Sequence, residues 1–170
     1  MNLKEYIRVI LDFPEPGVRF KDITPLLQRG EAFRFAIDQL TAFAKEKRAE
    51  VIVGPEARGF VIGAPIAYAL SAAFVPVRKA GKLPFGALSA GYQLEYGKES
   101  IEIHQDAIVP GQRVVVADDL LATGGTIRST IQLVEKLGGI VVGAAFLIEL
   151  SYLHGRDQLV NYDICSLIEY

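Results

Sequence analysis

Apolar positions along the chain follow two periods, and the alternation between them predicts an α/β protein. Helical spacing of apolar residues predicts helices in four segments, residues 3–11, 33–44, 60–70 and 125–137. Short apolar runs predict buried strands in four further segments, residues 51–53, 73–77, 114–117 and 140–147. Because helices and strands alternate from residue 33 onward, we expect a central, mostly parallel sheet flanked by helices.

Two segments interrupt this alternation. The first helix must end before Pro14, and we expect residues 13–25 to form a loop. An alternating pattern at residues 89–96 and 100–103 predicts two antiparallel strands joined around residues 97–98. Both segments are therefore expected to be excursions from the α/β core.

The composition indicates one globular domain. Half of the 170 residues are apolar, and neither a repeat nor a linker divides the chain. The formal net charge of −2 offers no basic field for nucleic acid or an anionic membrane, so we expect neither as a partner. Without an apolar leader or a long apolar span, a cytoplasmic location is expected.

The sulfur and imidazole groups give no sign of a metal centre. Cys165 is the only cysteine, and its apolar neighbours indicate a packed strand residue. His104 and His154 are far apart and lack the spacing of metal ligands. We therefore expect no site built on these side chains.

The segment after the predicted strand 114–117 has the residue types that bind a phosphorylated ribose. Asp118 and Asp119 can accept hydrogen bonds from a vicinal diol. The glycines of residues 123–126 (TGGT) let backbone N–H groups approach a phosphate at a helix N-terminus. An ordinary helix cap would use similar residues, but it does not explain adjacent carboxylates on a buried strand. Neither G-x-G-x-x-G nor G-x-x-x-x-G-K-[ST] is present to support another type of nucleotide site.

These residues resemble the signature of the type I phosphoribosyltransferases, and in particular of the bacterial enzymes that act on adenine. The resemblance covers nearly the whole chain. It rests on five motifs, which are FPEPGVRFKDITPLL at 13–27, GPEARGF at 54–60, RKAGKLP at 78–84, LEYGK at 94–98 and VVVADDLLATGGT at 114–126. It implies a single phosphoribosyltransferase domain over residues 1–170, with residues 1–30 forming a hood over the base and a mobile hairpin loop covering the substrates.

The implied reaction joins adenine to 5-phosphoribosyl 1-pyrophosphate and yields AMP and pyrophosphate, with Mg²⁺ held mainly by substrate oxygens. Asp118 and Asp119 would hold the ribose hydroxyls while positive charge develops at the anomeric carbon. The 5′-phosphate would bind to five residues of one loop, which are Ala122, Thr123, Gly124, Gly125 and Thr126. Pyrophosphate would bind to two further loops, through Glu56, Ala57, Arg58, Arg78, Lys79 and Lys82. Relatives hold a cis peptide in the first of these loops, which would lie at Glu56-Ala57.

The remaining implied roles concern the base. Glu95 and Tyr96 lie in the implied mobile loop, where Glu95 would exchange a proton with the purine. Phe20 would stack on adenine, and the backbone at Arg19 and Lys21 would pair with the edge of the ring. Without the resemblance, an exposed Glu-Tyr pair and a core phenylalanine would be ordinary.

Two alternatives to adenine transfer stay open. A different purine is one, because base identity rests on the resemblance alone. A regulator of the same fold that senses ligand without catalysis is the other, although the chain shows no DNA-binding extension. The family also implies a homodimer, which no residue pattern here reveals.

Overall fold

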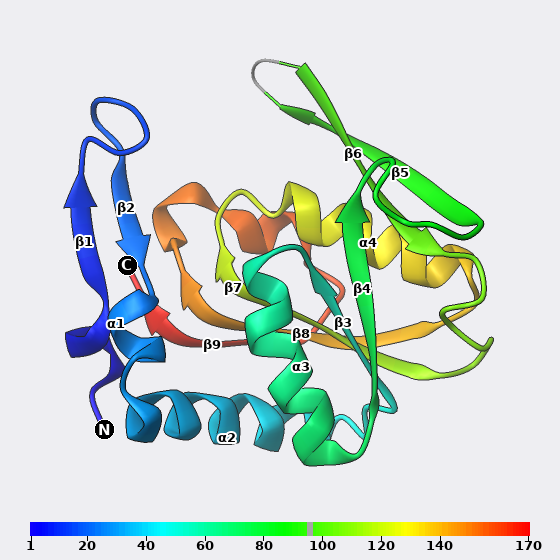
Figure 1. Cartoon of the computed structure of the whole chain (residues 1–170), viewed down its shortest axis with the longest axis horizontal. Coiled ribbons are helices and arrows are strands. Elements are labelled where there is room, and N and C mark those ends of the chain that lie inside the picture. Colours follow the sequence, from blue (N-terminus) through cyan, green and yellow to red (C-terminus); the bar gives the residue numbers. More distant parts are fainter. Residues whose placement is uncertain (95–96) are drawn as a thin grey trace.

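A seven-stranded, mostly parallel sheet with helices on both faces forms the body of the computed structural model, which describes residues 1–94 and 97–170 (Figure 1). Its strand order is β5-β6-β4-β3-β7-β8-β9, and β1 and β2 form a separate two-stranded sheet. The strands are β1 (Arg8–Leu11), β2 (Arg19–Asp22), β3 (Val51–Pro55), β4 (Ala73–Lys79), β5 (Ala87–Leu94), β6 (Gly97–His104), β7 (Arg113–Leu121), β8 (Ile140–Glu149) and β9 (Ile164–Glu169). The helices are α1 (Thr24–Leu27), α2 (Gly30–Glu46), α3 (Arg58–Leu70) and α4 (Gly125–Lys136), with 3₁₀ turns η1 (Leu3–Tyr6), η2 (Ser151–Leu153) and η3 (Gly155–Gln158).

The central strands are buried on both faces, which explains their continuous apolar runs. Successive side chains of a strand point to opposite faces of the sheet. Ile52 accordingly packs in the cluster that includes α2 and α3 residues, whereas Val51 and Val53 pack in the cluster that includes α4 residues. One apolar strand thus supplies side chains to two cores.

The structure confirms the predicted α/β core. The helices predicted at 33–44, 60–70 and 125–137 correspond to α2, α3 and α4. The four predicted strands correspond to β3, β4, β7 and β8, and β3, β4, β7, β8 and β9 run parallel to their neighbours in this group. Cys165 lies in β9, as its apolar setting predicted.

The predicted helix over residues 3–11 is wrong. Only η1 is helical, and Arg8–Leu11 form β1, which pairs antiparallel with β2. The prediction of a loop over 13–25 is correspondingly wrong for Arg19–Asp22 and for α1. Hydrophobic periodicity cannot distinguish a strand of only four residues from a helix. The pairing of β1 with β2 therefore determines the extended conformation of this segment.

The predicted antiparallel pair is confirmed over the described residues, but the prediction that its strands join around residues 97–98 is wrong. Gly97 is a strand residue that pairs with Leu94, so the chain does not reverse around residues 97–98. In Figure 1 the β5–β6 hairpin extends beyond the body of the sheet. Its β6 strand joins β4 antiparallel, with Lys79 opposite Ile101. Among the described helices, none has the length and apolar character needed to cross a bilayer.

Candidate active site

The carboxyl ends of β3, β4 and β7 enclose a pocket of about 260 Å³. Its lining consists of Pro55–Arg58 at and after the end of β3, Val77–Lys79 at the end of β4, Asp118–Leu120 in β7, and the residues Ile101 and Thr126. In parallel sheets, ligands bind where the carboxyl ends of strands meet. Residues predicted from separate motifs to bind one substrate therefore lie around one cavity.

Asp118 and Asp119 lie on β7 itself, which is longer than the predicted strand 114–117. The backbone N–H of Asp119 donates to Asp118 Oδ1 at 2.9 Å, and Arg58 Nε lies 3.0 Å from Asp119 Oδ2. Burial, and next the charge of Asp119, raise the pKa of Asp118 well above its ordinary value. Burial also raises the pKa of Asp119, although Arg58 opposes this shift. Two adjacent carboxylates are thus held in a buried position, where water solvates their charge poorly.

Two of the pocket's polar atoms lack hydrogen bonds to the described residues. Asp119 Oδ2 and Arg78 Nε are buried and have no hydrogen-bond partner in the part of the chain that the structure describes, although each lies in an ion pair. Buried polar groups in folded proteins are nearly always satisfied, and exceptions concentrate at functional sites. An acceptor and a donor are thus available to a ligand with both hydroxyl and anionic groups.

Residues 122–124 form a loop that leads into α4, and together with Gly125 and Thr126, the first two residues of α4, they border a hollow of about 90 Å³. Gly124 has φ +86°, and a Cβ there would lie 2.6 Å from the carbonyl oxygen of Gly155, so only glycine fits. Thr123 is exposed and Thr126 is half-buried. The loop therefore presents hydroxyls and the N-terminus of a 12-residue helix, a combination suited to a phosphate.

The residues that pack against Gly124 of this loop are held by a partly buried ion pair that the sequence did not reveal. Arg156 in η3 donates to both carboxylate oxygens of Glu149, at 2.6 and 2.7 Å. The hydrogen bond from Arg156 lowers the pKa of Glu149, although burial opposes the shift. This pair ties η3, which includes Gly155, to the end of β8.

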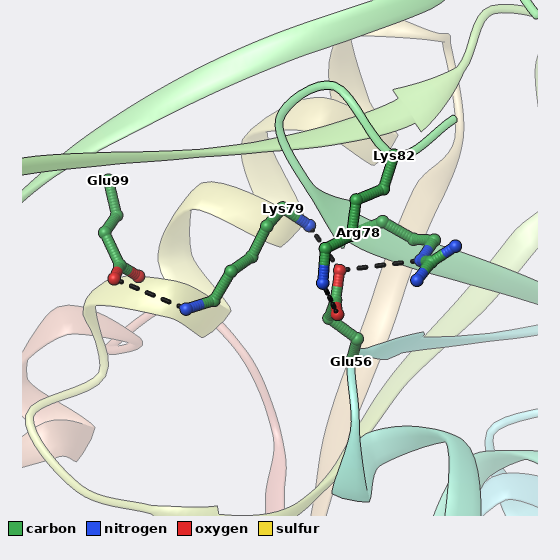
Figure 2. Close-up of polar contacts among 5 residues, drawn as sticks. All are labelled: Glu56, Arg78, Lys79, Lys82 and Glu99. Carbon is green, nitrogen blue, oxygen red and sulfur yellow. Dashed lines mark hydrogen bonds and ion pairs between the residues drawn. The ribbon is translucent and has the colours of Figure 1, made fainter. Parts of the chain in front are cut away.

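Two of the cationic side chains predicted to bind pyrophosphate, Arg78 and Lys82, contact the carboxylate of Glu56, whereas Lys79 Nζ lies 3.4 Å from Glu99 Oε1 (Figure 2). Lys82 Nζ donates to Glu56 Oε2 at 2.7 Å, and the backbone N–H of Lys79 donates to Oε1 at 2.7 Å. Arg78 Nε lies 3.5 Å from Oε1. The Glu56-Ala57 peptide bond is cis, as the resemblance implied. In this structure the side chain of Glu56 contacts cations, the charges that a bound anion would also contact.

A larger cavity of about 820 Å³ lies beside this pocket, between the β1–β2 hairpin and the main sheet. Its lining includes Arg19, Phe20 and Lys21, together with Leu150 and Tyr170, which the sequence reasoning missed. The Phe20 ring centroid lies 5.4 Å from Arg58 Cζ. Nothing local in the sequence marks residues 150–153 or Tyr170 as cavity residues, because the fold alone brings them opposite β2.

Lys21 is buried, and its Nζ lies 4.0 Å from the centroid of the Tyr170 ring. Burial, and next the charges of Arg19 and Lys4, lower the pKa of Lys21. Its ammonium is thus held against an aromatic ring, a cation–π contact. This leaves the backbone of β2 as the part of residue 21 most available to a ligand.

Arg58 and Leu120 line both cavities. The two cavities are therefore neighbouring compartments of one site. Glu95 and Tyr96, the residues predicted to act on the base from the hairpin, lie outside the described residues. Every other predicted site residue lies at one of the two cavities, at the phosphate loop or, for Lys82, on Glu56.

Comparison with known proteins gives concordant matches. The phosphoribosyl transferase domain family matches residues 25–166. The adenine phosphoribosyltransferase of Brevibacillus brevis is 61% identical over 170 residues, which are 100% of both chains. The crystal structure of the adenine phosphoribosyltransferase of Thermoanaerobacter pseudethanolicus is 55% identical, with a TM-score of 0.96 over 99% of this chain and 98% of that one. The Saccharomyces cerevisiae adenine phosphoribosyltransferase, solved with an imino-altritol bisphosphate and adenine, is 38% identical, with a TM-score of 0.92 over 96% and 95% of the two chains.

The raised pKa of Asp118 leads to a stability prediction. The unfolded carboxyl ionises near pH 3.8, whereas the folded one ionises at higher pH, so folding stability is lost as pH rises through the folded pKa. Asp118→Asn removes this loss. We expect it to raise the free energy of unfolding at pH 7 by about 1 kcal/mol, and by less near pH 4, in urea denaturation.

Asp38→Asn, on the exposed surface of α2, is the control and should show little change at either pH. An Asp118→Asn protein less stable than the wild type at pH 7 would show that the carboxylate supports the fold rather than strains it.

Proposed function

Because the chain belongs to the phosphoribosyltransferase family and matches its adenine-specific members over its whole length, we propose that it transfers the phosphoribosyl group of 5-phosphoribosyl 1-pyrophosphate to adenine. The products are AMP and pyrophosphate, as in purine salvage. The observation that carries this proposal is the pair of adjoining cavities that share Arg58, one polar and lined by Asp118 and Asp119, the other lined by Phe20.

The polar cavity and the phosphate loop suit the phosphoribosyl group. Asp118 and Asp119 accept hydrogen bonds from the 2′- and 3′-hydroxyls, and residues 122–126 hold the 5′-phosphate. As the bond from the anomeric carbon to pyrophosphate breaks, positive charge develops on the ribose ring. Preorganised carboxylates close to that charge stabilise the transition state. The adjacency of Asp118–Asp119 and the loop on one strand–loop–helix segment supports this assignment.

Pyrophosphate leaves into the region bounded by the loops after β3 and β4. Arg58 and Arg78 line this cavity, and Lys82 lies beside it on the Glu56 carboxylate. These cations offset the negative charge that accumulates on the leaving group. The chain as a whole carries a net charge of −2, so the attraction for pyrophosphate has to be local.

Adenine binds in the larger cavity against the Phe20 ring. The strand β2 pairs with β1 alone among the described strands, so alternate residues of β2 direct backbone N–H and C=O groups away from β1. Such groups can pair with the ring nitrogens and the exocyclic amine of adenine, whatever side chain residue 19 carries. The Saccharomyces cerevisiae relative was crystallised with adenine, and the Giardia lamblia relative, 33% identical, with 9-deazaadenine.

Glu95 and Tyr96 complete the proposed site from the β5–β6 hairpin. Glu95 accepts or returns the proton at the base nitrogen that attacks the anomeric carbon, and closure of the hairpin excludes water from the oxocarbenium-like centre. These two roles rest on the resemblance of LEYGK at 94–98 to the family's mobile loop.

Mg²⁺ is the proposed cofactor. The donor types fit this ion, because Mg²⁺ prefers oxygen ligands and the pocket contains Asp118 and the unsatisfied Asp119 Oδ2. We assign most of its coordination to substrate oxygens, where it would neutralise charge on pyrophosphate. A homodimer is the proposed form of the protein, on the strength of the family resemblance, and the cytoplasm is its proposed location.

A base panel tests the proposed reaction. The purified protein is incubated with Mg²⁺, 5-phosphoribosyl 1-pyrophosphate and one of adenine, hypoxanthine, guanine or xanthine, and nucleotide formation is followed by chromatography. We expect AMP from adenine and roughly a hundredfold less nucleotide from the 6-oxopurines, since a backbone acceptor placed for the exocyclic amine would be left unpaired against a 6-oxo group. Turnover of a 6-oxopurine instead of adenine, or no turnover at all, would contradict the proposal.

The role of the hood is tested by two neighbouring residues of β2. Phe20→Ala removes the stacking surface, and we expect KM for adenine to rise roughly tenfold. Arg19→Ala, the matched control, removes an exposed side chain but leaves the backbone, and should change KM less than about twofold. Steady-state kinetics with adenine as the varied substrate measure both. A larger effect of Arg19→Ala than of Phe20→Ala would show that a side chain, and not the backbone, recognises the base edge.

A further inference from the structure

Glu56 presents an electrostatic problem for a pyrophosphate site. It is the first residue after β3 and lines the pocket between the ends of β3, β4 and β7. Its side chain is 13% exposed and carries a negative charge where a multiply charged anion is expected to bind. A carboxylate this close to pyrophosphate would repel it.

The contacts of Glu56 show how its charge is balanced. Oε2 accepts from Lys82 Nζ, and Oε1 accepts from the backbone N–H of Lys79 and faces Arg78 Nε (Figure 2). Burial raises the pKa of Glu56, but the hydrogen bonds from Lys82 and from the Lys79 N–H, together with the charges of Lys82 and Arg78, bring it below its ordinary value. Glu56 is therefore ionised at neutral pH and is paired with cations proposed to bind pyrophosphate.

These contacts differ in how easily they can be exchanged. Lys82 is 46% exposed, and ion pairs of exposed lysines contribute little stability, so its ammonium can leave Glu56 at small cost. The N–H of Lys79 belongs to the backbone at the end of β4, and a charge-assisted bond from it anchors Oε1 firmly. A second tie joins the same loops, since the N–H of Glu56 donates to the carbonyl of Val77 at 2.9 Å.

We propose that Glu56 is an internal counter-ion that takes the place of pyrophosphate in the unliganded site. It holds Lys82 beside the pocket until pyrophosphate binds, and Lys82 then transfers from Glu56 Oε2 to the pyrophosphate oxygens. The bond from the Lys79 N–H to Oε1 keeps the loops in position throughout. Glu56 is thus a positioning residue that organises the cations and weakens the hold on the departing product. This inference rests on the proposed function.

A double-mutant cycle on pyrophosphate affinity tests this exchange. Isothermal titration calorimetry with Mg²⁺ and pyrophosphate would compare the wild type, Glu56→Gln, Lys82→Met and the double variant. Gln keeps an acceptor for the Lys79 N–H but neither repels the anion nor competes for Lys82. We expect Glu56→Gln to bind pyrophosphate roughly three- to tenfold more tightly.

The cycle also has a predicted sign of coupling. In the Lys82→Met background, Glu56→Gln should tighten binding by a smaller factor, because only the direct repulsion is then removed. An equal factor in both backgrounds, or weaker binding by Glu56→Gln, would overturn the inference. Damage to the fold cannot mimic the expected result, since it would weaken binding.

Two further variants separate this role from a general charge effect. Glu102→Gln removes the same charge from a carboxylate that accepts from the Gly81 N–H and from Ser89. Glu102 lies opposite Arg78 in the β4–β6 pair but forms no ion pair with Arg78, Lys79 or Lys82 among the described contacts. Glu102→Gln should change affinity less than about twofold, and Glu56→Asp, which keeps the charge, should not tighten binding. Tightening by either variant would overturn the inference. A wild type that turns over adenine while the cycle is additive would leave the proposed function intact, whereas a wild type that neither binds pyrophosphate nor turns over adenine would overturn both.

Discussion

The parallel register of β3 with β4 and with β7 is the constraint on which the rest of the site depends. Pro55 is level with Val77, and Val53 is level with Val116, two residues before Asp118. Glu56, Arg78 and Asp118 therefore come together because the buried strands β3 and β7 and the partly buried strand β4 pair in this register and no other. A slip of one residue would send the side chains of a strand to the opposite face, which the apolar cores on both faces forbid.

The site contains charged side chains of both signs, and apolar surroundings alone would not stabilise them. Two adjacent carboxylates on β7, whose pKa values are raised by burial, are balanced by Arg58, which also borders the cavity under the hood. On the other side, Glu56 balances Arg78 and Lys82. Each group is therefore held near an opposite charge before any ligand binds, which is the preorganisation that electrostatic catalysis requires.

How much the sequence predicts depends on whether a signal is local. The strands β3, β4, β7 and β8 and the helices α2, α3 and α4 follow from periodicity, and Asp118, Asp119 and residues 122–126 follow from the chemistry of one continuous segment. The first segment was mispredicted as a helix, because pairing with β2 and not local preference determines its conformation. Tyr170, Leu150 and the Glu149–Arg156 pair escaped prediction because only the fold places them at the site. The contacts of Glu56 with Lys79 and Lys82 also depend on the tertiary structure. Because of these contacts, we propose that Glu56 acts as a counter-ion, whereas the sequence predicted a substrate contact.

A crystal structure of the protein with AMP, pyrophosphate and Mg²⁺ tests most directly whether the two cavities sharing Arg58 form one active site. We expect the adenine ring to lie against Phe20, the ribose hydroxyls on Asp118 and Asp119, and pyrophosphate beside Arg58 and Arg78. AMP bound with its base away from the hood, or its ribose away from the two carboxylates, would contradict this proposal.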